Sequence, residues 1–106
     1  SQITTIEPIR RAAALMAETA GALGQRGIAL EYVDLGGGLG ISYDGAGVPS
    51  PDEYAKALVD GVGSTGLPIV IEPGRAIAGP AGALVARVVD VKARDGGSEF
   101  VVIEPA

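Results

Sequence analysis

The sequence predicts an α/β protein with parallel strands, and three observations support this prediction. Helical periodicity and short apolar runs alternate along residues 4–72, in the order helix, strand, helix, strand. Both apolar runs are nearly free of polar residues, which is typical of parallel strands that are buried on both faces. Each run ends in a glycine-containing turn, "GGG" at 36–38 and "PGR" at 73–75.

The first predicted helix spans residues 4–27. Its apolar side chains recur at alternating steps of three and four, which places them on one helix face. These residues are Ile6, Ile9, Ala13, Met16, Ala20 and Leu23. Thr4 and Glu7 fit a capping box, and Pro8 suits the first turn. Gly24 or Gly27 can end the helix.

The next elements are a strand over 28–35, a turn-rich loop, a second helix over 50–66 and a strand over 67–72. Ser50 is the expected N-cap of the second helix, with Pro51 in its first position and Glu53 completing a capping box. The expected inward face consists of Tyr54, Ala57, Leu58 and Val62.

The pattern changes after the second glycine turn. A small-residue segment over 76–82 leads to two strand-like runs, 83–94 and 98–105, which are joined by "DGG". This is typical of an antiparallel hairpin with a glycine loop. We therefore expect a boundary near Gly82, with an α/β part over 1–82 and the opening hairpin of a β domain over 83–106.

Composition excludes several classes of function. A length of 106 residues favours one core, and a net charge of −5 without a basic cluster argues against nucleic acid as a partner. The apolar runs are too short to cross a bilayer, so we expect no membrane partner. The sequence has no cysteine and no histidine, which removes thiolate chemistry, Ser-His pairs and common zinc sites. We expect no metal. The absence of an initiator methionine suggests a piece of a longer protein.

The glycine turn has two interpretations. Its N–H groups, from Gly36, Gly37 and Gly38, can converge on an anion such as a phosphate. It matches neither G-x-G-x-x-G, because Ile41 stands in the last position, nor the P-loop. Alternatively, the glycines serve only a tight strand exit with positive φ.

The segment "IEPGR" places a carboxylate and a guanidinium at the end of the neighbouring strand, where open sheets and barrels bind ligands. Arg75 could hold a phosphate or carboxylate, and Glu72 could accept a hydrogen bond from a protonated ring nitrogen. Alternatively, the two form a local ion pair. We expect Asp34 to be a backbone acceptor rather than a catalyst, and Tyr43 and Tyr54 to pack rather than react.

Four segments in this order, "SQIT", "YVDLGGGLGISY", "EPGRAIAGPAGAL" and "VKARDGGSEFVVIE", resemble the diaminopimelate decarboxylases. These belong to the alanine-racemase-like, fold-type-III enzymes that use pyridoxal phosphate. The resemblance covers essentially the whole chain. It implies part of a pyridoxal-phosphate-binding (β/α)8 barrel followed by the first strands of an antiparallel β domain, in a cytoplasmic homodimer.

The resemblance also implies an activity and a site. The full enzyme would be a lyase that converts the amino acid meso-2,6-diaminopimelate to L-lysine and carbon dioxide. Ser1 and the amides of residues 36–38 would hold the cofactor phosphate, with Glu72, Gly74 and Arg75 on its other side. Glu72 would pair with the pyridine nitrogen. Arg75 would bind the phosphate or a substrate carboxylate.

The chain departs from the family pattern in what it lacks. The family's Schiff-base lysine and ring-stacking histidine lie outside it, and Lys56 and Lys92 look like solvated charges. We therefore expect no catalytic residue in this chain and no activity from it alone. Two alternatives stay open: a non-catalytic phosphate-binding or self-associating half-barrel scaffold, and a decarboxylase that acts on ornithine or arginine.

Overall fold

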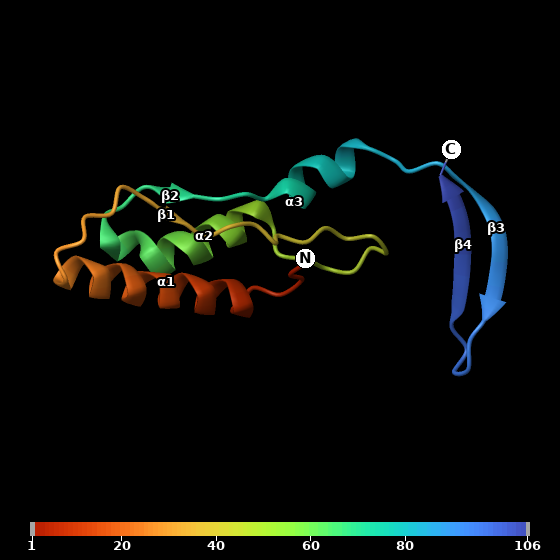
Figure 1. Cartoon of the computed structure of the whole chain (residues 1–106), viewed down its shortest axis with the longest axis horizontal. Coiled ribbons are helices and arrows are strands. Elements are labelled where there is room, and N and C mark those ends of the chain that lie inside the picture. The colour runs from red at the N-terminus through yellow and green to blue at the C-terminus, as the bar shows by residue number, and fades with distance from the viewer. Residues whose placement is uncertain (1, 106) are drawn as a thin grey trace.

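The computed structural model describes residues 2–105. An α/β part comes first, and a separate β-hairpin follows it (Figure 1). The helices are α1 (Glu7–Gln25), α2 (Pro51–Val62) and α3 (Gly74–Ala78), with short 3-10 turns η1 (Gly63–Thr65) and η2 (Gly79–Ala81). The strands are β1 (Val33–Asp34), β2 (Ile69–Val70), β3 (Ala86–Ala93) and β4 (Glu99–Pro105).

Helix α1 confirms one predicted end and corrects the other. It starts after Ile6 without any side-chain cap, so the capping box expected from Thr4 and Glu7 is wrong. Ile3 pairs with the loop at residues 38–40, Thr5 and Ile6 form a bend, and the helix begins only after them. At the other end Gly27 has φ +78°, and its N–H and that of Ile28 bond back into the last turn. Gly27 ends the helix as predicted.

Helix α2 has both features expected of it. The Ser50 hydroxyl accepts the N–H of Glu53, and the Glu53 carboxylate accepts the N–H of Ser50 at 2.8 Å, which completes the capping box. The backbone bond lowers the pKa of the Glu53 carboxyl. The four inward residues predicted from the sequence, Tyr54, Ala57, Leu58 and Val62, are all buried.

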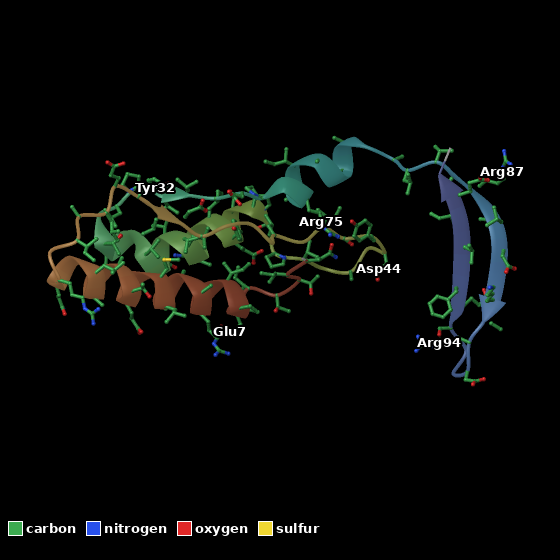
Figure 2. All side chains as sticks on the ribbon, viewed as in Figure 1. Glu7, Tyr32, Asp44, Arg75, Arg87 and Arg94 are labelled. Carbon is green, nitrogen blue, oxygen red and sulfur yellow. The ribbon has the colours of Figure 1, made fainter. Side chains whose placement is uncertain are left out.

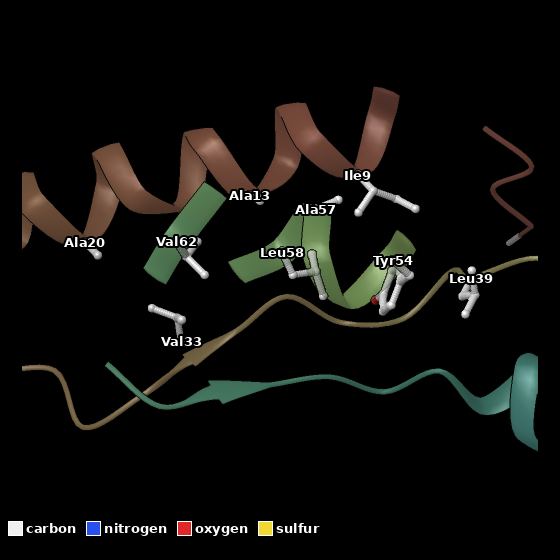
Figure 3. Packing of buried hydrophobic residues seen from close by; sticks show 9 residues of the cluster. All are labelled: Ile9, Ala13, Ala20, Val33, Leu39, Tyr54, Ala57, Leu58 and Val62. Atoms are coloured by element: carbon white, nitrogen blue, oxygen red, sulfur yellow. The ribbon is translucent and has the colours of Figure 1, made fainter. Parts of the chain in front are cut away.

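The core lies between the two helices and the β1 segment, as Figure 3 shows. Helices α1 and α2 pack closely because α2 has Gly61 at the contact. A Cβ on Gly61 would lie 2.4 Å from the Cβ of Ala13, and Ala13 is fully buried. This close approach brings both helices onto the same face of the strands.

The parallel sheet is confirmed, but its strands are much shorter than predicted and only one face is covered. Val33 pairs with Ile69 and Asp34 with Val70. Val33 points toward the helices and is buried, whereas Asp34 and Val70, on the opposite face, are exposed. The expectation of burial on both faces is wrong for this chain, because the helices cover the strands from one side.

The segment after the second glycine turn contains α3, which sequence reasoning missed, and then the predicted hairpin. Strands β3 and β4 are antiparallel and stand apart from the α/β part (Figure 1). Val89 is an extra residue, a β-bulge, since Val88 pairs with Ile103 and Asp90 with Val102. Apolar side chains of the hairpin, including Val88 and Ile103, are about half exposed.

The Gly61 contact leads to a prediction about stability. Glycine to alanine inside a helix normally stabilises by about 1 kcal/mol. Here we expect Gly61→Ala to destabilise the protein by about 1–3 kcal/mol, the usual cost of overpacking a tight contact. Thermal or denaturant unfolding measures it. Gly63→Ala is the control, because its Cβ would meet only Val59 at 3.6 Å. A Gly61→Ala variant as stable as the parent would contradict the packing described.

Candidate functional site

Three segments that are far apart in the sequence run side by side beyond the ends of β1 and β2. The middle segment is the turn after β1, and it is hydrogen-bonded on both sides through its carbonyl groups. The Gly38 carbonyl accepts the N–H of Ile3 at 2.8 Å, and the Gly36 carbonyl accepts the N–H of Glu72 at 2.8 Å. The glycine turn and the "EPGR" turn are thus direct neighbours, as the sequence led us to expect.

Glycine at position 37 is required by the closeness of this contact. A Cβ on Gly37 would lie 2.1 Å from the backbone oxygen of Glu72, far inside van der Waals contact. Gly36 and Gly38 have φ of +65° and +97°, values that other residues rarely adopt. The glycines are therefore needed for a tight turn at the end of the strand, as one of the two interpretations held. This requirement does not exclude an anion bound at the same turn.

The N–H groups of the turn are not equivalent. That of Gly36 donates to the Asp34 carboxylate at 2.8 Å, so Asp34 is the backbone acceptor that we expected. The N–H groups of Gly37 and Gly38 have no acceptor within residues 2–105. Because the turn's carbonyls bond sideways, these two donors are available to a ligand.

Glu72 lies one turn away on the neighbouring segment. The hydrogen-bond ladder between β1 and β2 continues to the N–H of Glu72. Side chains alternate between the two faces of an extended chain, so the Glu72 side chain lies on the same face as those of Val70 and Asp34. That face is the one that the helices leave open, and Glu72 is exposed there. The N–H of Gly74 donates to the Glu72 carbonyl at 2.7 Å and is therefore engaged inside its own turn.

Arg75 is the second residue of α3, and its side chain lies between that helix and the loop that carries Asp44 (Figure 2). Its Nη1 donates to the Gln2 side-chain oxygen at 3.1 Å and to the Tyr43 hydroxyl at 3.2 Å. Both partners are neutral. Within residues 2–105 Arg75 forms no ion pair, so the local pair with Glu72 is not seen, and the positive charge is uncompensated by any carboxylate there.

The structure also shows what sequence reasoning missed. Gln2 was not expected at the site, and Tyr43 was expected to pack, yet Tyr43 is 71% exposed and bonds to Arg75. Tyr54 does pack, at 3% exposure. The predicted phosphate ligand Ser1 lies outside the described residues. No local pattern predicted that Gln2 and Tyr43 contact Arg75, because these contacts span 73 and 32 positions.

The two lysines lie away from this site. Lys56 pairs with Asp60 at 3.0 Å on α2, and Lys92 lies 3.8 Å from Asp90 on the hairpin. Both side chains are largely exposed, which confirms their interpretation as solvated charges. Within residues 2–105 no cluster of three or more acidic side chains could hold a metal ion. The helices described there also lack the combined length and apolarity that crossing a bilayer requires.

Neighbouring segments thus carry two backbone donors without an acceptor in residues 2–105, a guanidinium without a carboxylate partner there, and one exposed carboxylate. Backbone N–H groups and an arginine are groups that can bind an oxyanion such as phosphate. The carboxylate adds an acceptor for a protonated group. This arrangement suits a ligand with a phosphate at one end and a basic nitrogen at the other.

Comparison with known proteins agrees with this chemistry. Residues 1–79 match the family model described as "Pyridoxal-dependent decarboxylase, pyridoxal binding domain". The diaminopimelate decarboxylase of Neisseria meningitidis serogroup A is 40% identical over 106 residues, which is 100% of this chain and 26% of that protein. That of Haemophilus influenzae is 40% identical over 96 residues, 90% of this chain and 23% of that protein.

The fold is similar as well. The crystal structure of diaminopimelate decarboxylase from Helicobacter pylori, complexed with L-lysine, matches with a TM-score of 0.77 at 33% identity. The match covers 98% of this chain and 26% of that one. The chain spans about a quarter of the length of the curated relatives it matches.

The close contact of the two turns can be tested by adding one methyl group. We expect Gly37→Ala to lower stability by about 1–3 kcal/mol, because the turn and the Glu72 carbonyl must separate. The melting temperature measures this. Gly47→Ala is the control, since its Cβ would meet nothing within 4 Å and its φ is not positive. Equal melting temperatures for the two variants would show that the turns do not touch.

Proposed function

The chain belongs to the pyridoxal-dependent decarboxylases, and we propose that it is part of an enzyme that converts meso-2,6-diaminopimelate to L-lysine and carbon dioxide. The observation that carries the proposal is the pairing of free donors with an acceptor at adjacent strand ends. The N–H groups of Gly37 and Gly38 and the guanidinium of Arg75 suit an anion, and Glu72 suits a basic ring nitrogen. Both relatives named above are diaminopimelate decarboxylases, which favours this substrate over ornithine or arginine.

The residues present fit pyridoxal 5'-phosphate. The amides of Gly37 and Gly38 bind its phosphate, with Ser1 and Gly36 as further contacts that the family resemblance implies. The Gly36 amide already donates to Asp34, so we assign it a backbone role in shaping the turn. The N–H of Gly74 bonds to the Glu72 carbonyl, so Gly74 helps to shape the turn between Glu72 and Arg75. Arg75 supplies positive charge to the phosphate or to a substrate carboxylate.

Glu72 determines the protonation state of the ring. An exposed carboxylate beside a pyridine nitrogen keeps that nitrogen protonated by accepting its hydrogen bond. The bound cofactor supplies an electron sink that stabilises the carbanion left when carbon dioxide departs. Glu72 strengthens this effect by maintaining positive charge on the ring.

Residues outside this chain complete the enzyme. Lys56 lies on the exposed face of α2 and Lys92 on the hairpin that stands apart from the α/β part (Figure 1), so neither is placed to link the cofactor covalently. We therefore expect the isolated chain to be inactive. After treatment with pyridoxal phosphate and borohydride, it should carry no stoichiometric adduct at one lysine.

We further propose that residues 1–82 form the later part of a β/α barrel and that residues 83–106 open a C-terminal β domain. One open sheet face in the α/β part supports the first statement, because a closed barrel would cover it with its other strands. The half-exposed apolar side chains of the hairpin support the second. A homodimer and a cytoplasmic location follow from the family resemblance and stay predictions.

The reaction itself is the first test. A protein of the relatives' length that carries this chain, loaded with pyridoxal phosphate, should release carbon dioxide from meso-2,6-diaminopimelate and form L-lysine in equal amounts. L-Ornithine and L-arginine are the competing substrates, and we expect turnover of both to be slower. Faster turnover of L-ornithine or L-arginine would identify that amino acid as the substrate instead. If none of the three is decarboxylated, the proposed function is wrong.

A substitution at Glu72 tests its role. Glu72→Gln keeps the shape of the side chain but removes the charge that favours a protonated ring nitrogen, so we expect kcat to fall by about 100-fold, within the range for one acid–base group. Cofactor affinity should change much less. Glu18→Gln, an exposed carboxylate on α1, is the matched control and should keep full activity. A Glu72→Gln enzyme with the kcat of the parent would contradict the assignment.

A further inference from the structure

We propose that Gln2 and Tyr43 are positioning residues that hold Arg75 in a neutral clamp and direct one edge of its guanidinium toward the oxyanion of the ligand. The inference rests on the proposed function for the identity of that oxyanion, which is the cofactor phosphate or a substrate carboxylate. It concerns two residues to which neither the sequence analysis nor the family resemblance assigned a role in binding.

The clamp consists of three hydrogen bonds between segments that are distant in sequence. Gln2 accepts from Arg75 Nη1 at 3.1 Å, and its own Nε2 donates to the Ile41 carbonyl at 3.0 Å. Tyr43 accepts from the same Nη1 at 3.2 Å. Gln2 is thus fixed at both ends of its amide, and it connects the first described residues to the loop and to α3.

The clamp engages only one of the three guanidinium nitrogens. Nη1 has two N–H bonds, and Gln2 and Tyr43 accept one each. Within residues 2–105 no group accepts from Nε or Nη2. These two nitrogens form the side-on edge that binds a carboxylate or phosphate with two parallel hydrogen bonds. The clamp therefore fixes the side chain and leaves the binding edge free.

The neutrality of the clamp matters as much as its geometry. A carboxylate in place of Gln2 or Tyr43 would hold Arg75 more tightly, but it would also compensate the charge that attracts the ligand. An amide and a hydroxyl orient the guanidinium without competing with an incoming anion. Tyr43 makes this contact although its side chain is largely exposed, so packing alone does not explain its position.

The test compares two substitutions of Gln2 in a protein of the relatives' length. Gln2→Met removes both amide bonds at nearly constant length, and Gln2→Glu adds a charge beside Arg75. We expect oxyanion binding to weaken about threefold in the first and about tenfold or more in the second, the scale of one charge-assisted hydrogen bond. Tyr43→Phe, which removes only the hydroxyl, should weaken it two- to threefold, a roughly similar step.

Three measurements identify the oxyanion. The dissociation constant of pyridoxal phosphate rises if Arg75 serves the phosphate, and KM for meso-2,6-diaminopimelate rises at unchanged cofactor affinity if it serves a substrate carboxylate. The melting temperature is the third. Gln2→Glu should melt no lower than Gln2→Met because a new ion pair replaces the lost bond, even though its ligand affinity is lower. A merely structural Gln2 would not separate stability from affinity in this way.

Gln25→Glu is the matched control, since Gln25 is an exposed residue at the end of α1. It should leave both affinities unchanged. Equal affinities in the parent, Gln2→Met and Gln2→Glu proteins would overturn the inference while the proposed function stands. If the parent protein binds no pyridoxal phosphate, the proposed function fails instead. In that case the test uses inorganic phosphate, whose affinity is measured by its effect on melting temperature. We expect the parent to bind it most tightly, Gln2→Met less and Gln2→Glu least, and a different order overturns the inference.

Discussion

The constraint on which the site depends is the sideways hydrogen bonding of the turn after β1. Its carbonyls bond to Ile3 on one side and to Glu72 on the other, so three strand ends are held at the same level. The conformation that directs the carbonyls sideways leaves the N–H groups of Gly37 and Gly38 without acceptors in the described part of the chain. Glycine at 37 is needed because the Glu72 backbone occupies the space of a side chain. Binding capacity and tight packing thus have one structural cause.

The second feature that shapes the chain is its one-sided core. Helices α1 and α2 cover one face of the strands, and the closeness at Gly61 and Ala13 keeps both on that face. The opposite face presents Asp34, which shapes the turn, and Glu72, which we assign to the ligand. An interior face that carries polar residues at the strand ends is the arrangement by which β/α barrels hold ligands.

How much of this could be predicted depends on the range of the interaction. The capping box of Ser50 and Glu53, the end of α1 at Gly27 and the bond from Gly36 to Asp34 involve neighbours in sequence, and local rules predicted them. The capping box predicted at Thr4 is absent because Ile3 pairs with the distant loop at 38–40 and the helix begins only at Glu7. The adjacency of the two glycine turns followed from parallel topology. The partners of Arg75 could not be predicted, because its contacts with Gln2 and Tyr43 correspond to no periodicity or fixed spacing in the sequence.

The central claim is that the glycine turn after β1 and the "EPGR" turn after β2 bind one anion together. A crystal structure of the longer protein with pyridoxal 5'-phosphate tests it most directly. The account predicts phosphate oxygens within hydrogen-bond distance, about 2.7–3.2 Å, of the Gly37 and Gly38 nitrogens, with Glu72 beside the ring nitrogen. A cofactor bound elsewhere in the protein, with these two N–H groups facing only solvent, would contradict it.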